Sequence, residues 1–189
     1  MKTRILMLGM AMSCIFAGNA LALTKAEYDT QKNRINADYK VNRDNCGSLK
    51  SNAKDICLSE AKGAEKVAKA ELEAQYKPGA KQSREVAMAK ADSAYDIAKE
   101  KCDDLAGNPK DICIKDAKAA QVKARESAKV NKATTDASTN RAASVNEVKK
   151  EASSETRSAD YQAAKARCDS FAGNAKDTCQ KDAKAKFGM

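Results

Sequence analysis

Cysteine is the residue type in this chain that is best suited to chemistry. The 189 residues include seven cysteines and no histidine. Six of the cysteines form three pairs with ten residues between the members, namely Cys46 and Cys57, Cys102 and Cys113, and Cys168 and Cys179. Metal-binding cysteines usually lie roughly two to four residues apart and often act with histidine, and redox-active cysteines usually form Cys-x-x-Cys. The spacing therefore favours structural disulfides over a soft-metal or redox site.

Each cysteine pair belongs to a unit that occurs three times. A tyrosine precedes the first cysteine by seven residues, and an acidic residue, Ala and Lys follow the second cysteine at constant offsets. These residues are Tyr39, Tyr95 and Tyr161, and Glu60 to Lys62, Asp116 to Lys118 and Asp182 to Lys184. Such a constant register indicates a repeat protein. Six cysteines allow fifteen pairings, and the repeat singles out the three pairings within the units.

The middle unit has the pattern of two helices joined by a turn. Its apolar and small residues recur three and four positions apart, as on one buried helical face. We expect Gly107 to end the first helix in a left-handed conformation and Asn108 to cap the second. Folding back there brings Cys102 and Cys113 to the ~4.4–6.8 Å Cα separation of a disulfide. The predicted seams are Met88, Ala91, Tyr95, Ala98, Cys102 and Leu105 on one arm, and Cys113, Ala117, Ala120 and Ala124 on the other.

The turns of the other two units are predicted by comparison with the middle one. The third repeats the turn as Gly173-Asn174, and the seam of its first arm ends at Phe171. The first has Ser51 in place of glycine, so we expect a looser turn there, with Asn52 still capping and Leu49 in the seam. A Lys-Asp pair follows each turn, at Lys54-Asp55, Lys110-Asp111 and Lys176-Asp177. We expect the aspartates to favour the helix start and the lysines to be solvated.

These patterns predict an all-α fold without β-strands. About six helices should form three antiparallel hairpins, each held by a disulfide, either as one bundle or as an elongated array. The expected division is a hairpin over 23–77, a second over 81–130, a polar linker over 131–144 and a third hairpin over 145–189. The linker is either a loop, with a break near Thr134 to Asn140, or a solvated helix. Thr24 to Glu27 and Ser144 to Glu147 have the pattern of capping boxes that open helices.

Residues 1–22 have the pattern of a cleaved signal peptide. Lys2 and Arg4 precede an apolar run, and Ala20-Leu21-Ala22 is a small-x-small cleavage site. The run is too short for a membrane span of ~20 residues, so we expect export to the periplasm and no transmembrane segment after cleavage. Lipid anchoring at Cys14 is the alternative. Cleavage after Ala22 removes Cys14 and leaves an even number of cysteines, which suits disulfides in an oxidising compartment.

The composition limits the core and the classes of function. Leu, Ile, Val and Phe make up only 19 of the 167 residues after position 22, so helix-forming alanines and crosslinks must replace a large core.

Removal of two basic residues with the signal lowers the net charge from +9 to +7. That charge suits an anionic envelope glycan or glycolipid, but basic residues alternate with acidic ones and no aromatic platform stacks bases, so no nucleic acid is expected. No catalytic constellation or cofactor motif is present, so no enzyme and no cofactor are expected.

The repeated unit also carries a resemblance to known proteins. The exported Ala/Lys/Asp-rich chain with Tyr-x6-Cys-x10-Cys resembles a family of small proteobacterial periplasmic proteins, often labelled TolA-like cell-envelope biogenesis proteins. The resemblance covers the whole chain after the signal, although nothing resembles TolA's membrane anchor or globular end domain. It implies a periplasmic, helical protein without catalytic residues.

The sequence therefore predicts a non-enzymatic periplasmic repeat protein that is a structural or interaction component of the cell envelope. A thiol-based soft-metal or redox protein, and a basic binder of anionic glycolipid, are the alternatives. The sequence does not specify the partner or the oligomeric state.

Overall fold

A computed structural model of the chain describes residues 23–136 and 142–189. Within these ranges it has six α-helices and no β-strand, which confirms the predicted all-α fold. The helices are α1 (Lys25–Asn45), α2 (Ser51–Tyr76), α3 (Ala80–Cys102), α4 (Gly107–Asp136), α5 (Ala142–Cys168) and α6 (Gly173–Phe187), with a short 3-10 turn, η1 (Cys46–Ser48), after α1. The predicted signal peptide over 1–22, with Cys14, lies outside the described residues.

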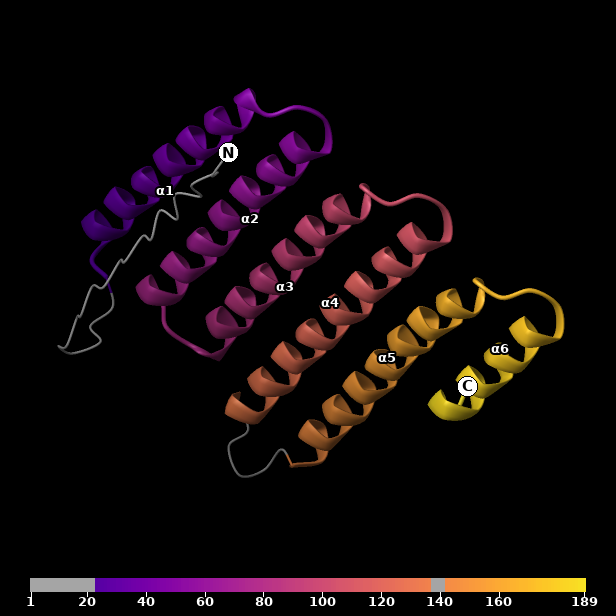
Figure 1. The fold of residues 1–189 in the computed structure, drawn as a ribbon. Helices are drawn as coiled ribbons and strands as arrows, with labels where there is room; N and C mark the ends of the chain where they lie inside the picture. Colours follow the sequence, from indigo (N-terminus) through magenta and orange to yellow (C-terminus); the bar gives the residue numbers. More distant parts are fainter. Residues whose placement is uncertain (1–22, 137–141) are drawn as a thin grey trace, which may run out of the picture.

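The six helices lie side by side in a single row (Figure 1). In the part of the chain that the structure describes, each helix contacts only the helices next to it in sequence. The turns that join α1 to α2, α3 to α4 and α5 to α6 lie along one edge of the row, and the α2–α3 connection lies along the opposite edge (Figure 1). Of the two predicted arrangements, the structure is therefore the elongated array.

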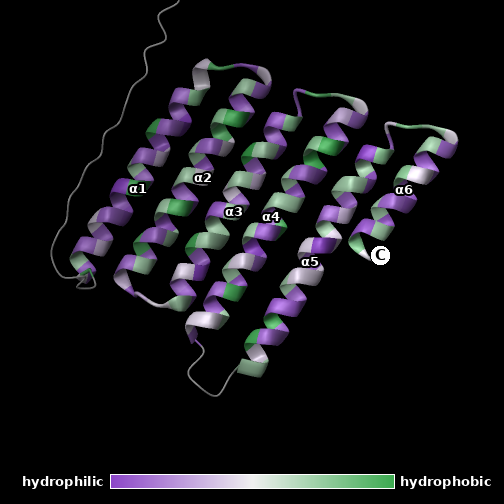
Figure 2. Cartoon of the chain, turned by 60° about the horizontal axis from the view of Figure 1, so that its bottom comes forward, coloured by the Kyte–Doolittle hydropathy of each residue, from purple (hydrophilic) through white to green (hydrophobic). Residues whose placement is uncertain are grey.

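The core consists of thin seams between neighbouring helices. Nine of its fifteen buried hydrophobic residues are alanines, and the largest side chains that are fully buried are Cys46, Cys102 and Cys168. Hydrophilic and hydrophobic residues are interspersed along every helix (Figure 2). A single layer of helices has no interior between layers to fill. The chain therefore needs few large apolar residues, in agreement with its composition.

A helix inside the row has two buried stripes, of which the sequence pattern revealed only one. On α3, Cys102 and Tyr95 face α4, as predicted. Ser93 faces α2 instead and is 6% exposed, and its hydroxyl donates to the Gly63 carbonyl at 3.3 Å. A Cβ atom at Gly63 would lie 3.0 Å from the Ser93 Cβ and 3.6 Å from Ile97 Cδ1. The missing side chain thus lets α2 and α3 approach closely. On α4, Ala120 and Ala124 are exposed, so that part of the predicted seam is wrong.

The helix boundaries confirm one predicted capping box and correct the other. Thr24 and Glu27 form a complete capping box at the start of α1, and the backbone hydrogen bond from Thr24 lowers the pKa of the Glu27 carboxyl. Ser144, in contrast, lies inside α5, which begins at Ala142.

The end of α4 resolves part of the polar stretch 131–144, for which the sequence allowed a loop or a solvated helix, because its first six residues are helical. The hydroxyls of Thr134 and Thr135 donate to the Asn131 carbonyl at 2.9 and 2.8 Å, and Lys132 pairs with Asp136 one turn away. These local contacts satisfy polar groups in the helix, so the preferred break does not begin at Thr134.

Candidate functional site: the disulfide-closed turns

The three cysteine pairs are disulfides within hairpins. Cys46–Cys57 and Cys102–Cys113 have Cα–Cα distances of 5.7 Å, and Cys168–Cys179 has 5.6 Å. These distances fall in the ordinary range for disulfides, and the pairing is the one that the repeat singled out. The first cysteine of each pair is at most 1% exposed, so one half of each disulfide is buried between the two helices that it joins.

The helices that lead into the turns end earlier than the sequence indicated. The helix α3 ends at Cys102, five residues before Gly107. The residue three positions after each first cysteine therefore lies in the connection and not in the helical seam. Leu49, Leu105 and Phe171 occupy this position, and they are 40%, 44% and 53% exposed. Their assignment to the buried seams was wrong, and each turn instead presents one large apolar side chain to solvent.

One residue in each turn adopts a left-handed backbone conformation. Gly107 and Gly173 have φ angles of +60° and +55°, and Ser51 has φ of +49° at the equivalent position. The first turn therefore has the same conformation at this position as the others, and the predicted looser turn is not found. A residue with a Cβ pays roughly 1–2 kcal/mol for this conformation. The disulfide and the neighbouring hairpin hold Ser51 there in spite of this cost.

The lysine after each turn closes the turn electrostatically in two of the copies. Lys110 Nζ lies 3.1 Å from Asp103 Oδ1, and Lys176 Nζ lies 2.9 Å from Asp169 Oδ1. Both aspartates directly follow the first cysteine. In the first copy Gly47 stands at that position, which removes the equivalent partner of Lys54. The lysines of the second and third copies thus keep the predicted contact with solvent, and each also has an ion pair that the sequence did not predict.

The asparagine of the turn joins one hairpin to the next. Asn52 Nδ2 donates to the Glu100 carbonyl at 2.8 Å and to Asp104 Oδ1 at 2.7 Å. Asn108 Nδ2 donates to Ser170 Oγ at 2.6 Å. Asp104 and Ser170 are equivalent residues, each two positions after a first cysteine. The predicted capping role is not found, and α2 begins without a side-chain cap.

An ion pair at equivalent positions reinforces each junction between hairpins. Lys101 Nζ lies 3.4 Å from Glu60 Oε1, and Arg167 Nη2 lies 2.5 Å from Asp116 Oδ1. The basic residue directly precedes a first cysteine, and the acidic residue belongs to the repeated acid-Ala-Lys motif of the preceding hairpin. The motif therefore carries a contact between repeats, which the sequence pattern alone did not reveal.

The tyrosines of the repeat are half-buried and pack across the hairpins. The Lys118 ammonium lies 5.1 Å from the centre of the Tyr95 ring, and the Tyr161 ring meets Phe187 edge to face at 6.5 Å. A further aromatic contact fastens the first hairpin at the end away from its disulfide, where the Tyr28 and Tyr76 rings lie 4.6 Å apart. The Tyr28 hydroxyl donates to Glu73, and this hydrogen bond raises the pKa of the Tyr28 phenol.

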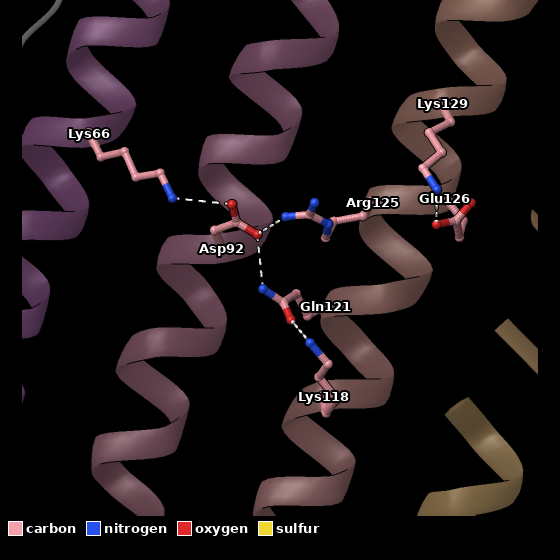
Figure 3. Close-up of polar contacts among 7 residues, drawn as sticks. All are labelled: Lys66, Asp92, Lys118, Gln121, Arg125, Glu126 and Lys129. Atoms are coloured by element: carbon pink, nitrogen blue, oxygen red, sulfur yellow. Dashed lines mark hydrogen bonds and ion pairs between the residues drawn. The ribbon is translucent and has the colours of Figure 1, made fainter. Parts of the chain in front are cut away.

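Asp92 is the centre of a polar cluster that spans α2, α3 and α4 (Figure 3). Its carboxylate accepts hydrogen bonds from Lys66 at 3.2 Å, from Gln121 at 2.9 Å and from Arg125. Burial acts to raise the pKa of Asp92, but the bonds from Arg125 and Lys66 outweigh it and hold the pKa below its ordinary value. Asn36 and Ser158 occupy the equivalent positions of the other units, so no repeat signal marks this cluster.

The contacts described above are crosslinks, hydrogen bonds, ion pairs and packing contacts within and between hairpins. In the described ranges, no three cysteine, aspartate or glutamate side chains gather as a metal site would require. No helix among those residues has the length and apolar character needed to cross a membrane. The chain is thus an all-α array with disulfide-closed turns. No protein-family model matches it, and no curated protein and no solved structure is significantly similar to it.

Proposed function

We propose that the chain is an exported, non-enzymatic repeat protein that serves as a structural or interaction component of the bacterial cell envelope. The observation that carries this proposal is the row of three turns, each closed by a disulfide, along one edge of a one-layer array. Disulfides persist in oxidising compartments such as the periplasm. The signal-like segment at 1–22 and the resemblance to TolA-like periplasmic proteins support the same compartment.

The polar groups support a binding role more than a catalytic one. The Asp92 carboxylate accepts hydrogen bonds from two cations and an amide. These bonds stabilise its ionised form and lower its pKa, which makes it a weaker base. The exposed apolar side chains Leu49, Leu105 and Phe171 recur at equivalent points of the turn edge. A repeated apolar group on a charged surface is suited to contact with an extended partner.

The first test concerns the compartment and the state of the thiols. Cells are quenched with acid, free thiols are alkylated, and the mass and amino-terminal sequence of the protein are determined. We expect a chain that starts at Leu23. All six remaining cysteines should be in disulfides, so none should carry the alkylating group. Free or metal-loaded thiols would support a soft-metal or redox role instead. A chain that starts at Cys14 and carries a lipid on that residue would support anchoring.

The second test concerns the partner. A photo-crosslinking residue is placed in intact cells at Leu49, Leu105 or Phe171, and at the exposed Lys99 on α3 as a control. We expect the three turn positions to capture the same protein or anionic glycan, and Lys99 to capture little of it. Equal capture at all four positions, or none at any, would contradict a role for the turn edge.

A further inference from the structure

The last helix exposes the surface that joins the earlier hairpins to each other. Along α2, Asn52, Glu60 and Gly63 lie on the side that contacts α3. Ile56 lies on the same side, one helical turn after Asn52. The equivalent residues of the second copy, Asn108, Ile112, Asp116 and Ala119, are half-buried or buried, whereas those of α6 are all exposed. The exposed set on α6 is Asn174, Thr178, Asp182 and Ala185.

The first helix exposes the complementary surface. Val41 is 58% exposed although it is a large apolar residue. Its equivalent in the third copy, Ala163, is 3% exposed. Its equivalent in the second copy, Ile97, lies beside Gly63 of the preceding hairpin. Ala37 is likewise exposed where the equivalent Ser93 is buried. The outer side of α1 thus has the pattern of a helix that packs on a preceding hairpin.

The outer side of α6 is also hollowed. A shallow hollow of about 540 Å³ is lined by Phe171, Asn174, Ala175, Thr178, Cys179 and Asp182. At the equivalent place in the second copy, Asn108 and Asp116 bond to Ser170 and Arg167 of the third hairpin. The hollow is therefore the place that a further hairpin would occupy if the row continued.

We propose that the chain associates with copies of itself head to tail, with α6 of one copy packed against α1 of the next. The two helices would run antiparallel, as α2 and α3 do and as α4 and α5 do (Figure 1). A contact between two different surfaces of the same molecule leaves one surface of each kind free, so it generates open rows of variable length unless the rotation between copies closes a ring. Because the helices lie in a single row (Figure 1), we expect open rows. Such self-association does not depend on the proposed partner in the envelope.

The contact between copies is weaker than the contacts within one chain. Thr178 replaces the isoleucine of the first two copies, and Asn45 replaces the basic residue found as Lys101 and Arg167. The helix α6 has 15 residues, whereas α2 has 26. Association between molecules also loses translational freedom, which hairpins of one chain do not lose. The rows should therefore lengthen only as the protein concentration rises.

The test measures the mass of the oxidised protein by sedimentation velocity from micromolar to millimolar concentration. We expect the mean mass to rise with concentration. Val41→Asp and Thr178→Arg should each abolish the rise, because each variant has lost one of the two surfaces. An equimolar mixture of the two should form dimers and nothing longer, since one intact surface of each kind remains. Lys99→Glu, in the middle of the row, should associate like the original chain.

A second variant keeps the proposal open to refutation where the natural contact is too weak to measure. Combining Thr178→Ile with Asn45→Arg restores the residue types of the internal junctions and should tighten association about tenfold or more. All these positions are exposed, so far-UV circular dichroism should show unchanged helix content. A monomer at every concentration in both the original and the restored chain would overturn the proposal. Association that survives Val41→Asp would show that copies meet through another surface.

Discussion

The three turn asparagines provide a sharp test of how the hairpins are joined. Asn52 and Asn108 bond to the next hairpin, whereas no hairpin follows Asn174 among the residues that the structure describes. The same substitution, Asn to Ala, at all three positions therefore removes a junction in two cases and nothing equivalent in the third. Asn174→Ala is the matched control.

The expected magnitudes follow from the partners. A neutral hydrogen bond contributes ~1 kcal/mol net, and one to a charged group contributes roughly 1.5–3 kcal/mol. Asn52 donates to a backbone carbonyl and to the Asp104 carboxylate, and its half-buried position reduces the sum. We expect a loss of about 2 kcal/mol for Asn52→Ala and about 1 kcal/mol for Asn108→Ala. Asn174→Ala should change the free energy of unfolding by less than ~0.5 kcal/mol.

The assay is urea unfolding of the oxidised protein, followed by far-UV circular dichroism at low micromolar concentration. Low concentration keeps association through α6 from contributing. If the asparagines were helix caps instead, each substitution would cost a similar ~1 kcal/mol. A loss at Asn174 as large as that at Asn108 would refute the junction and restore the capping interpretation. A neutral Asn52→Ala would refute it as well.

Three further predictions concern the turn backbone, the crosslinks and the polar cluster. Ser51→Gly should stabilise the fold by about 1 kcal/mol and Gly107→Ala should destabilise it by a similar amount, because both residues are left-handed; urea unfolding measures both, and effects of the same sign would contradict this. Replacing Cys102 and Cys113 together by Ala should lower the free energy of unfolding by roughly 3 kcal/mol. An unchanged thermal midpoint would contradict the stabilising role of this disulfide. The pKa of Asp92 is lowered in the fold, so its contribution to the free energy of unfolding is present above about pH 4 and is lost as the pH falls through the lowered value. Asp92→Asn should therefore reduce the loss of stability at acid pH, measured by unfolding curves at a series of pH values. An equally steep loss in the variant would refute the role of Asp92.

The features that the sequence predicted well are local or repeated. Helix type, the Thr24 capping box and the three cysteine pairings each depend on residues close together in the chain or on a register that recurs. Cys102 and Cys113 could be paired because the turn between them places the two residues at the same distance along neighbouring helices. The features that it missed are contacts between hairpins, because a side chain at a turn has more than one polar partner within reach.

Asn52 shows the limit of local reasoning. Asparagine at a turn is a good helix cap by propensity, but the next hairpin offers it a carbonyl and a carboxylate. Leu105 shows another limit, since its spacing continues the seam although the helix has ended at Cys102. The second buried stripe of α3 was missed because alanine and serine carry little periodic signal. Equivalence among copies could have found the junctions, since Glu60 and Lys101 recur as Asp116 and Arg167.

The order of the cysteines along the chain has a consequence for how the molecule matures. Synthesis begins at the amino end, so among the six paired cysteines Cys46 becomes available first, and its mate Cys57 is the next thiol to emerge, eleven residues later. The same holds for the two later pairs. An oxidant that joins each newly exposed thiol to the one before it produces the native bonds directly, so the protein should mature without the help of a disulfide isomerase.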